Sequence, residues 1–372
     1  MIRWGRMIRR AILGGALALG LVALGIGGAS AAEKVRIGHF SWPGYALFYV
    51  AQGENLAPDL EFEFTIIEDP IQLFSLLATD HLDVVLSTIE FGPIAAEQDL
   101  PVKLVAYTNI SYGTDGIVVH PDIVSAQDLK GQKVAVLEGG LAQIYMAIYL
   151  EQNGVKWQDV EMVNLIMTDA SAAMISGQVA GGEFWDPWRT QILRDFPEAR
   201  MVANSLEPYW LETALLADSM FYSNKFIEEH RDTALKTMKA LYDSIDFYRR
   251  DPAKAEQYMA EGLKFNLSDI ELVMGPPNDV PNGALIYVYQ FLEAARFCGV
   301  APGDPPFGQR NGQMDDHWRL TNQWWVTFGL MKTIQEPEKG IDCSLHKELY
   351  DSGYRQGEGM ELPTRHIGFK IQ

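Results

Sequence analysis

Segments with the patterns of strands and helices alternate through the first half of the chain, and this alternation constrains the fold more than any other feature. Short β-branched and aromatic runs, typical of strands, are followed by amphipathic segments typical of helices. Because parallel strands need helical crossovers, the pattern predicts an α/β fold with two lobes and mostly parallel sheets. The alternating segments, beginning with a strand in each lobe, are Val35–Phe40, Gly44–Gln52, Phe62–Ile67, Pro70–Thr79 and Asp83–Ser87, then Lys133–Leu137, Ala142–Gln152, Met162–Met167, Ser171–Gly177 and Val179–Trp185.

The last part of the chain is expected to be mainly helical. The predicted helices are Phe226–Glu229, Thr233–Arg249 and Asp316–Lys332. A stretch rich in Pro, Gly and Asn lies ahead of the third helix and predicts loops there.

The N-terminus has the three parts of a secretory signal peptide. Four arginines precede the uncharged stretch Ala11–Gly28, and Ala29-Ser30-Ala31 supplies small residues for cleavage. We therefore expect residues 1–31 to be removed near Ala31/Ala32 and the protein to be exported to the periplasm. An uncleaved N-terminal anchor is the alternative. No later stretch has the roughly 18 apolar residues that a membrane span needs.

Charge and cysteine content exclude several function classes. With 49 acidic and 30 basic residues the formal charge is −19, which argues against a nucleic acid as a partner. The two cysteines, Cys298 and Cys343, cannot build a four-thiolate metal site. In an oxidising compartment two thiols more often pair, so a Cys298–Cys343 disulfide is expected, with two unrelated buried thiols as the alternative.

Aromatic and acidic residues follow the predicted strands at their carboxyl ends. In open α/β sheets the ligand crevice lies outside these ends. The residues found there are Ser41 to Tyr45, Ser87 to Glu90, Glu138 to Gly140 and Trp185 to Trp188. Lysine and arginine are almost absent from this set.

The same residues resemble a known family. The landmarks are Ile37-Gly38 through Trp42, Gly44-Tyr45, Tyr49-Val50-Ala51, Asp83-Val84 with Ser87-Thr88, Ser125–Ala135, Ala170–Gly177 and Phe184-Trp185-Asp186-Pro187. Their order and spacing resemble the periplasmic substrate-binding proteins of the nitrate, sulfonate, taurine and thiamine-pyrimidine group of ABC importers. The resemblance covers roughly Val35 to Ile192; the loops from Phe265 to Met314 and the tail from Thr333 are longer than the family's pattern.

The resemblance implies a bilobed, type II periplasmic binding protein fold with two crossovers, near Asp115–Val118 and Leu215–Met220. Lobe 1 would comprise residues 32–116 and 217–372, and lobe 2 residues 117–216. It also implies a monomeric solute-binding protein without a cofactor, which closes around its ligand and delivers it to an ABC permease with its ATPase.

The residues expected to bind the ligand are Ser41, Trp42, Tyr45, Ser87, Thr88, Glu90, Tyr112, Glu138, Gly139, Gly140, Trp185 and Asp186. Purely structural alternatives exist for several of them: core packing for Trp42, Tyr45 and Trp185, a helix cap for Asp186, and an exposed position for Glu138.

Two ligand chemistries stay open. The carboxylates and indoles favour a cationic, zwitterionic or nitrogen-heterocyclic solute. An oxyanion such as a sulfonate is the alternative, held by Ser41, Ser87, Thr88 and the amides of Gly139 and Gly140. A zwitterion such as the aminosulfonate taurine would use both features.

An exported enzyme related to pyrimidine-synthesis proteins is the second functional hypothesis. Those enzymes carry a CCCFC-type cysteine motif that this chain lacks, and no G-x-S-x-G, H-E-x-x-H or P-loop motif is present. The histidines, among them His120, His230 and His317, are scattered, so no metal site is expected.

Overall fold

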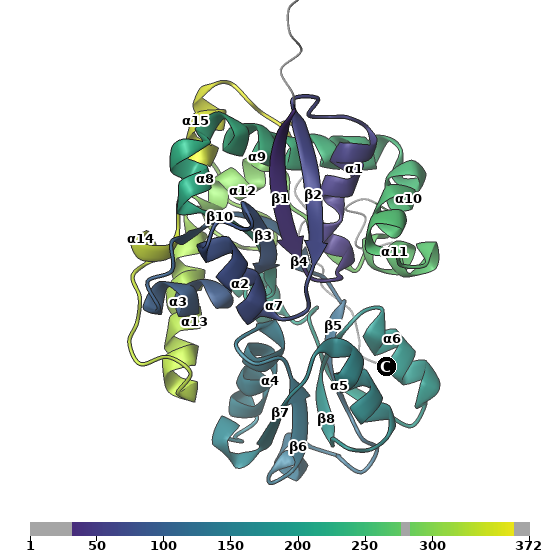
Figure 1. Cartoon of the computed structure of the whole chain (residues 1–372). Coiled ribbons are helices and arrows are strands. Elements are labelled where there is room, and N and C mark those ends of the chain that lie inside the picture. Colours follow the sequence, from purple (N-terminus) through teal and green to yellow (C-terminus); the bar gives the residue numbers. More distant parts are fainter. Residues whose placement is uncertain (1–31, 277–282, 361–372) are drawn as a thin grey trace, which may run out of the picture. The chain divides into compact units, whose positions relative to one another are not determined.

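Two β-sheets flanked by helices organise the protein in a computed structural model, which describes residues 32–276 and 283–360 (Figure 1). The expected signal peptide, residues 1–31, lies outside the described residues. Each sheet has its own buried apolar core. An α/β fold with two lobes was the prediction, and the two separate sheets confirm it.

The first sheet has six strands in the order β11-β4-β10-β3-β1-β2. Strand β1 pairs in parallel with β2 and β3, whereas β10 runs antiparallel between β3 and β4, and β11 adds an antiparallel edge to β4. Its strands are β1 (Glu33–His39), β2 (Leu60–Ile66), β3 (Val84–Thr88), β4 (Val102–Ser111), β10 (Ala217–Ser223) and β11 (Ile286–Val288).

The second sheet has five strands in the order β7-β6-β8-β5-β9. Strand β6 is parallel to β7 and β8, and β5 is antiparallel to β8 and β9. The strands are β5 (Asp115–Val119), β6 (Lys133–Val136), β7 (Glu161–Asn164), β8 (Gly181–Trp185) and β9 (Arg200–Asn204). Four of the six strands of the first sheet and four of the five strands of the second run in one direction, which confirms the expectation of mostly parallel sheets. The strands that run the opposite way are β10 and β11 in the first sheet and β5 in the second.

The chain passes between the sheets twice. It leaves the first sheet after Ser111, at the end of β4, and enters the second at Asp115. It returns between Thr213, which ends α7, and Ala217, which begins β10. These short connections place the residues around them between the two sheets.

Helices cover the sheets and connect their strands. In the part of the chain nearest the first sheet they are α1 (Leu47–Gly53), α2 (Pro70–Ala78), α3 (Phe91–Glu97), α8 (Asn224–Glu229), α9 (Arg231–Arg250), α10 (Pro252–Leu263), α11 (Leu267–Met274), α12 (Phe291–Phe297), α14 (Pro337–Gly340) and α15 (Ser344–Asp351). Those of the second sheet are α4 (Leu141–Gln152), α5 (Met167–Ile175), α6 (Trp188–Asp195) and α7 (Pro208–Thr213), and α13 (Gln313–Phe328) follows α12. Short 3-10 turns occupy Pro43–Tyr45, Ala126–Leu129 and Trp157–Asp159.

Local sequence explains where many of these elements begin and end. Asp69 caps α2 by accepting hydrogen bonds from the amides of Ile71 and Gln72, and Pro70 at the first position needs no donor partner. Gly329, with φ of 79°, ends α13 in the left-handed conformation that glycine favours.

Three predicted boundaries are corrected. The strand expected at Met162–Met167 ends at Asn164, because Met167 already begins α5. The last long helix, expected at Asp316–Lys332, is α13 and ends at Phe328. The loops expected between Phe265 and Met314 contain α11, β11 and α12 in their described part, and the three-residue edge strand β11 is too short to show a periodic pattern.

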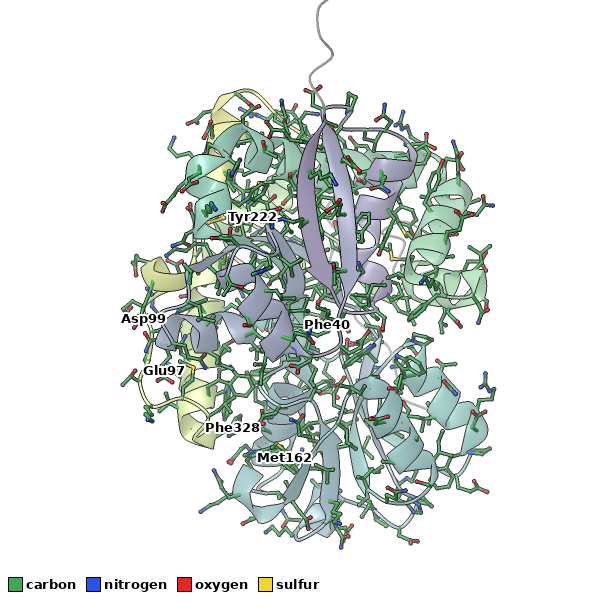
Figure 2. The ribbon with its side chains drawn as sticks, in the orientation of Figure 1. Phe40, Glu97, Asp99, Met162, Tyr222 and Phe328 are labelled. Atoms are coloured by element: carbon green, nitrogen blue, oxygen red, sulfur yellow. A yellow bond between two sulfur atoms is a disulfide. The ribbon has the colours of Figure 1, made fainter. Side chains whose placement is uncertain are left out.

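Helix α13 joins the two cores. Its residues Trp325 and Phe328 pack into the apolar cluster of the second sheet, although the surrounding segments belong to the first, and Figure 2 shows Phe328 beside the second sheet. The expected disulfide is present: Cys298, after α12, is joined to Cys343, before α15. The bond therefore closes a loop that contains the whole of α13.

Candidate functional site

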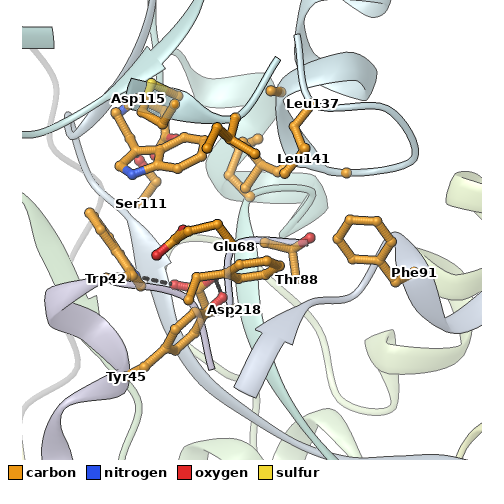
Figure 3. Close-up of a pocket in the computed structure, with 17 residues that line it drawn as sticks. Trp42, Tyr45, Glu68, Thr88, Phe91, Ser111, Asp115, Leu137, Leu141 and Asp218 are labelled. Atoms are coloured by element: carbon orange, nitrogen blue, oxygen red, sulfur yellow. Dashed lines mark hydrogen bonds between the residues drawn. The ribbon is translucent and has the colours of Figure 1, made fainter. Parts of the chain in front are cut away.

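A cavity of about 60 Å³ lies between the two sheets (Figure 3). Residues from both lobes surround it. They are Phe40, Trp42, Tyr45, Glu68, Thr88, Phe91, Ser111, Asp115, Leu137, Gly140, Leu141, Ala142, Ile166, Met167, Trp185, Leu216 and Asp218.

The topology brings these residues together. Strands β1 and β3 of the first sheet and β6 and β8 of the second all end near the cavity, and the segments that follow them supply Phe40, Phe91, Leu137 and the start of α4. The two crossovers between the sheets add Ser111, Asp115 and Asp218. The site is thus at the carboxyl ends of parallel strands, as the general rule for such sheets predicts.

Asp218, in β10, is an acid of the cavity whose two carboxyl oxygens both accept hydrogen bonds from aromatic side chains. Its Oδ2 accepts a hydrogen bond from the indole Nε1 of Trp42, and its Oδ1 accepts one from the hydroxyl of Tyr45, each at 2.7 Å (Figure 3). Burial, opposed by these two hydrogen bonds, raises the pKa of Asp218 to about 7. The aromatic donors therefore fix the carboxyl group in place without supplying a positive charge.

Asp115, the first residue of β5, faces the cavity from the other crossover. Behind it lies Glu183 of β8, whose side chain is buried. Burial and the adjacent Asp115 carboxylate raise the pKa of Glu183 well above its usual range, so Glu183 keeps its proton beside Asp115. Burial raises the pKa of Asp115 as well.

Glu68, which follows β2, is the third acid. Its Oε1 accepts a hydrogen bond from the amide of Ser41 at 3.0 Å. Three carboxyl groups therefore line the cavity, and no Lys, Arg or His stands among the described residues around it. Arg189 is buried nearby, but its guanidinium donates to Asp186 and to the carbonyl of Gly113.

Aromatic rings form much of the remaining wall. Phe40, Trp42, Tyr45 and Phe91 come from the first lobe, and Trp185 comes from the second. Rings beside carboxylates are the surroundings that organic cations favour, because the face of each ring carries partial negative charge.

Five of the residues expected to bind the ligand line this cavity: Trp42, Tyr45, Thr88, Gly140 and Trp185. The other seven, which lie outside its lining, are Ser41, Ser87, Glu90, Tyr112, Glu138, Gly139 and Asp186. Of these, Glu138 and Gly139 line a neighbouring groove on the surface.

Glu90 is fully buried at the start of α3. Burial raises the pKa of its carboxyl group to about 8. Asp186 is also fully buried, and it accepts hydrogen bonds from the amide and hydroxyl of Thr190 and from Arg189. Its contacts are those of a residue that holds the start of α6, in line with the structural alternative.

The amides considered for an oxyanion already have partners. The Gly139 amide donates to Oε1 of Gln143 at 2.7 Å, and the Gly140 amide donates to the carbonyl of Leu137. A sulfonate would have to break these bonds.

The three cavity acids were missing from the sequence expectations. Asp115 and Asp218 lie inside the two predicted crossovers, so an acidic residue in each crossover was the available signal. Glu68 follows the predicted strand Phe62–Ile67, the one strand end of the first lobe that the candidate residues left out.

The part of the chain that the structure describes has neither a metal-binding cluster nor a membrane-spanning helix. No cluster of three or more His, Cys, Asp or Glu residues there could hold a metal ion. No helix within residues 32–276 and 283–360 is long and apolar enough to cross a membrane.

Comparisons with known proteins agree with the fold. The alkanesulfonate-binding protein SsuA of Xanthomonas axonopodis pv. citri superposes with a TM-score of 0.64 at 17% identity, over 84% of this chain and 99% of that chain. The periplasmic nitrate-binding protein NrtA of Synechocystis gives a TM-score of 0.65 at 12% identity, over 87% and 90%. A desulfurization enzyme, DSZB, shares the fold with a TM-score of 0.55 at 14% identity, over 86% and 99%.

Sequence comparison identifies the family. A binding protein of Brucella abortus is 21% identical over 236 residues, which is 63% of this chain and 67% of the relative. The family model described as NMT1/THI5 like matches residues 42–255, more than half of the chain. This match includes Trp42, Tyr45, Asp115 and Asp218 of the cavity, and the chain belongs to the NMT1/THI5-like family.

Proposed function

We propose that this protein is the solute-binding component of an ABC importer and that it captures a small organic cation between its two lobes. The observation that carries the proposal is the set of three carboxyl groups, Glu68, Asp115 and Asp218, around a cavity whose described lining has no basic side chain. Export to the periplasm as a monomer, and delivery to a permease with its ATPase, complete the proposal.

Electrostatics favours a cation over an anion. Two unit charges 4 Å apart interact by about 4 kcal/mol at the effective dielectric constant of about 20 typical near a protein surface. The sign of this term is attractive for an ammonium or guanidinium group beside Asp218 and Asp115, and repulsive for a sulfonate. The structural likeness to sulfonate and nitrate binders is a likeness of fold, and the cavity chemistry differs from what an anion needs.

The shape of the cavity limits the group that it holds. A cavity of about 150 Å³ accommodates benzene, and the cavity here has about 60 Å³. A compact head group such as an ammonium, amidinium or guanidinium fits this space, with N–H donors directed to Asp218 and Asp115 and an apolar face toward Trp42 or Trp185.

Binding would be coupled to lobe closure. We propose lobes of residues 32–116 with 217–372, and 117–216, which meet at the cavity. A ligand that contacts Asp218 from one side and Trp185 from the other stabilises the closed state by the difference in its contacts between the two states. The permease then responds to the closed form.

A thermal-shift screen followed by calorimetry tests the proposal. The mature protein is screened against alkylammonium, guanidinium and amidinium salts and against sulfonates and nitrate. A ligand at 100 times its Kd raises the free energy of unfolding by about 2.7 kcal/mol. Stabilisation by cations alone supports the proposal, whereas stabilisation by sulfonates alone overturns it.

Two variants localise the binding. Asp218→Asn keeps the shape of the side chain and removes its charge, so cation affinity should fall about ten- to a hundredfold. Asp122→Asn is the matched control, because Asp122 is exposed and outside the cavity.

Incubation of each ligand with the protein, followed by mass spectrometry, addresses the enzyme alternative. Recovery of unaltered ligand supports transport, and a product supports catalysis.

A further inference from the structure

A second hollow adjoins the acidic cavity. It is a surface groove of about 750 Å³, and Phe91, Leu137 and Ile166 line both the groove and the cavity. We propose that the ligand is an amphiphilic cation, whose charged head lies in the cavity and whose apolar extension passes Phe91 and lies in this groove. The inference rests on the proposed function and deepens it by naming the second half of the ligand.

Apolar side chains form much of the groove, and polar residues such as Asp69, Glu138 and Asn164 also line it. Phe74, Ile94 and Ala95 of the first lobe form one side, and Ile166 of the second lobe and Leu330, just after α13, contribute as well. Ile71 at its edge is 80% exposed, more than any other large apolar side chain described. Exposure of this apolar surface to water is unfavourable. An apolar ligand group that covers it removes the surface from water and so gains binding free energy.

Phe91 lies at the boundary between the cavity and the groove, together with Leu137 and Ile166. A Cβ atom built on Gly140 would lie 2.9 Å from Cζ of Phe91, and one built on Gly139 would lie 3.3 Å from its Cε1. The Phe91 ring of the first lobe therefore rests directly on the two-glycine turn of the second lobe. Figure 3 shows Phe91 at the edge of the cavity, beside Thr88.

Size supports the same conclusion. The cavity alone holds one compact head group, so any larger part of a ligand must leave it. On the side of the cavity lined by Phe91, Leu137 and Ile166, the neighbouring surface is the groove, to which both lobes contribute apolar residues. The other side of the cavity is formed by the crossovers, with Ser111, Asp115 and Leu216. A ligand extension in the groove would contact both lobes and add to the stability of the closed state.

Calorimetric titration with n-alkylammonium chlorides, from methyl to hexyl, tests the inference. If the chain enters the groove, affinity should rise by about fourfold for each added methylene, the factor that corresponds to about 0.8 kcal/mol. Ile94→Asn and Leu330→Asn place an amide in the groove outside the cavity. They should weaken hexylammonium at least tenfold and leave methylammonium unchanged. Val124→Asn is the control, since Val124 is exposed elsewhere.

The outcomes separate this inference from the proposed function. If all alkylammonium ions bind equally and Asp218→Asn abolishes their binding, the groove does not hold the ligand and the proposed function stands. If no organic cation binds, the proposed function fails. If Ile94→Asn and Leu330→Asn leave every affinity unchanged but block uptake in vesicles that contain the permease, the groove is a docking surface for the permease and the inference is wrong.

Discussion

The indole Nε1 of Trp325 donates a hydrogen bond to the main-chain carbonyl of Glu90 at 2.9 Å. Trp325 belongs to α13 and packs into the core of the second sheet, whereas Glu90 begins α3 beside the first sheet. The amide groups of Gln309 and Gln313, just before and at the start of α13, donate to the carbonyls of Leu211 and Glu212 in α7. The C-terminal region thus fastens the two lobes to each other beside the cavity.

The variant Trp325→Phe should reduce the stability of this connection without leaving a large void. Loss of one buried hydrogen bond lowers the free energy of unfolding by about 1 kcal/mol. The smaller phenyl ring also leaves a small cavity, which lowers it further. Urea denaturation measures the difference. Trp324→Phe is the matched control, because Trp324 stacks on Phe328 but makes no bond to Glu90. Equal stability of the two variants would show that the bond to Glu90 contributes nothing.

Cation affinity should rise with pH. Burial raises the pKa of Asp218 to about 7, so near neutral pH this carboxyl group holds a proton in part of the ligand-free molecules. A cation favours the ionised form, and binding therefore releases protons. Between pH 6 and pH 8 the affinity for methylammonium should increase until Asp218 is fully ionised.

Calorimetry in two buffers of different ionisation enthalpy counts the protons released. Asp218→Asn should reduce that number and flatten the pH dependence. A pH-independent affinity in the wild-type protein would contradict the assigned role of Asp218.

Protein stability without ligand should have the opposite pH dependence. Burial raises the pKa of Glu90 to about 8, above its ordinary value of 4.5, so the folded state binds more protons than the unfolded state between these values. The contribution of Glu90 to stability is therefore largest below pH 4.5 and is lost as the pH rises through 8. The buried histidines His39, His317 and His346, whose pKa values are lowered to about 4, 3 and 4, act in the other direction below pH 6.5 only.

Measurement between pH 6.5 and pH 8.5 therefore isolates the carboxyl groups. The free energy of unfolding of Glu90→Gln should fall by about 2 kcal/mol less over this range than that of the wild-type protein. Other carboxyl groups, such as Glu293 and Glu256, contribute equally to both proteins and cancel in the comparison. Parallel curves for the two proteins would mean that Glu90 is not buried as described.

The first half of the fold is predictable from sequence because its strands and helices have regular patterns. Phe62–Ile67 and Pro70–Thr79, for example, differ by at most two residues from β2 and α2 at either end. The aromatic cavity residues Trp42, Tyr45 and Trp185 follow from the same pattern, since they stand where strands end.

Asp115 and Asp218 could not be found from this pattern, because the only sequence signal for them was an acidic residue inside each predicted crossover. They are 103 positions apart in the printed sequence and meet only because the two crossovers lie side by side. Glu90 shows the opposite problem. It follows a strand end, yet the first turn of α3 directs its side chain into the core, and one residue of rotation in a helix is enough to exchange buried and cavity-facing positions.

Export should be visible at the N-terminus of the protein. Mass spectrometry of periplasmic protein is expected to show a chain that begins at or near Ala32, because the stretch Ala29-Ser30-Ala31 has the small residues of a cleavage site. Recovery of intact Met1 from a membrane fraction would instead show an uncleaved anchor.

The Cys298–Cys343 disulfide should hold α13 in place. The loop between these residues contains the entire helix. The disulfide therefore limits how far α13 can move from the first lobe when the hydrogen bond of Trp325 is lost. The loop-entropy model assigns about 4 kcal/mol to a closure of this length. Cys298→Ser with Cys343→Ser should therefore lower the free energy of unfolding by up to about this amount. Trp325→Phe should cost more in the serine variant than in the wild-type protein, and a purely additive double-mutant cycle would show that the disulfide and the Trp325 bond act independently.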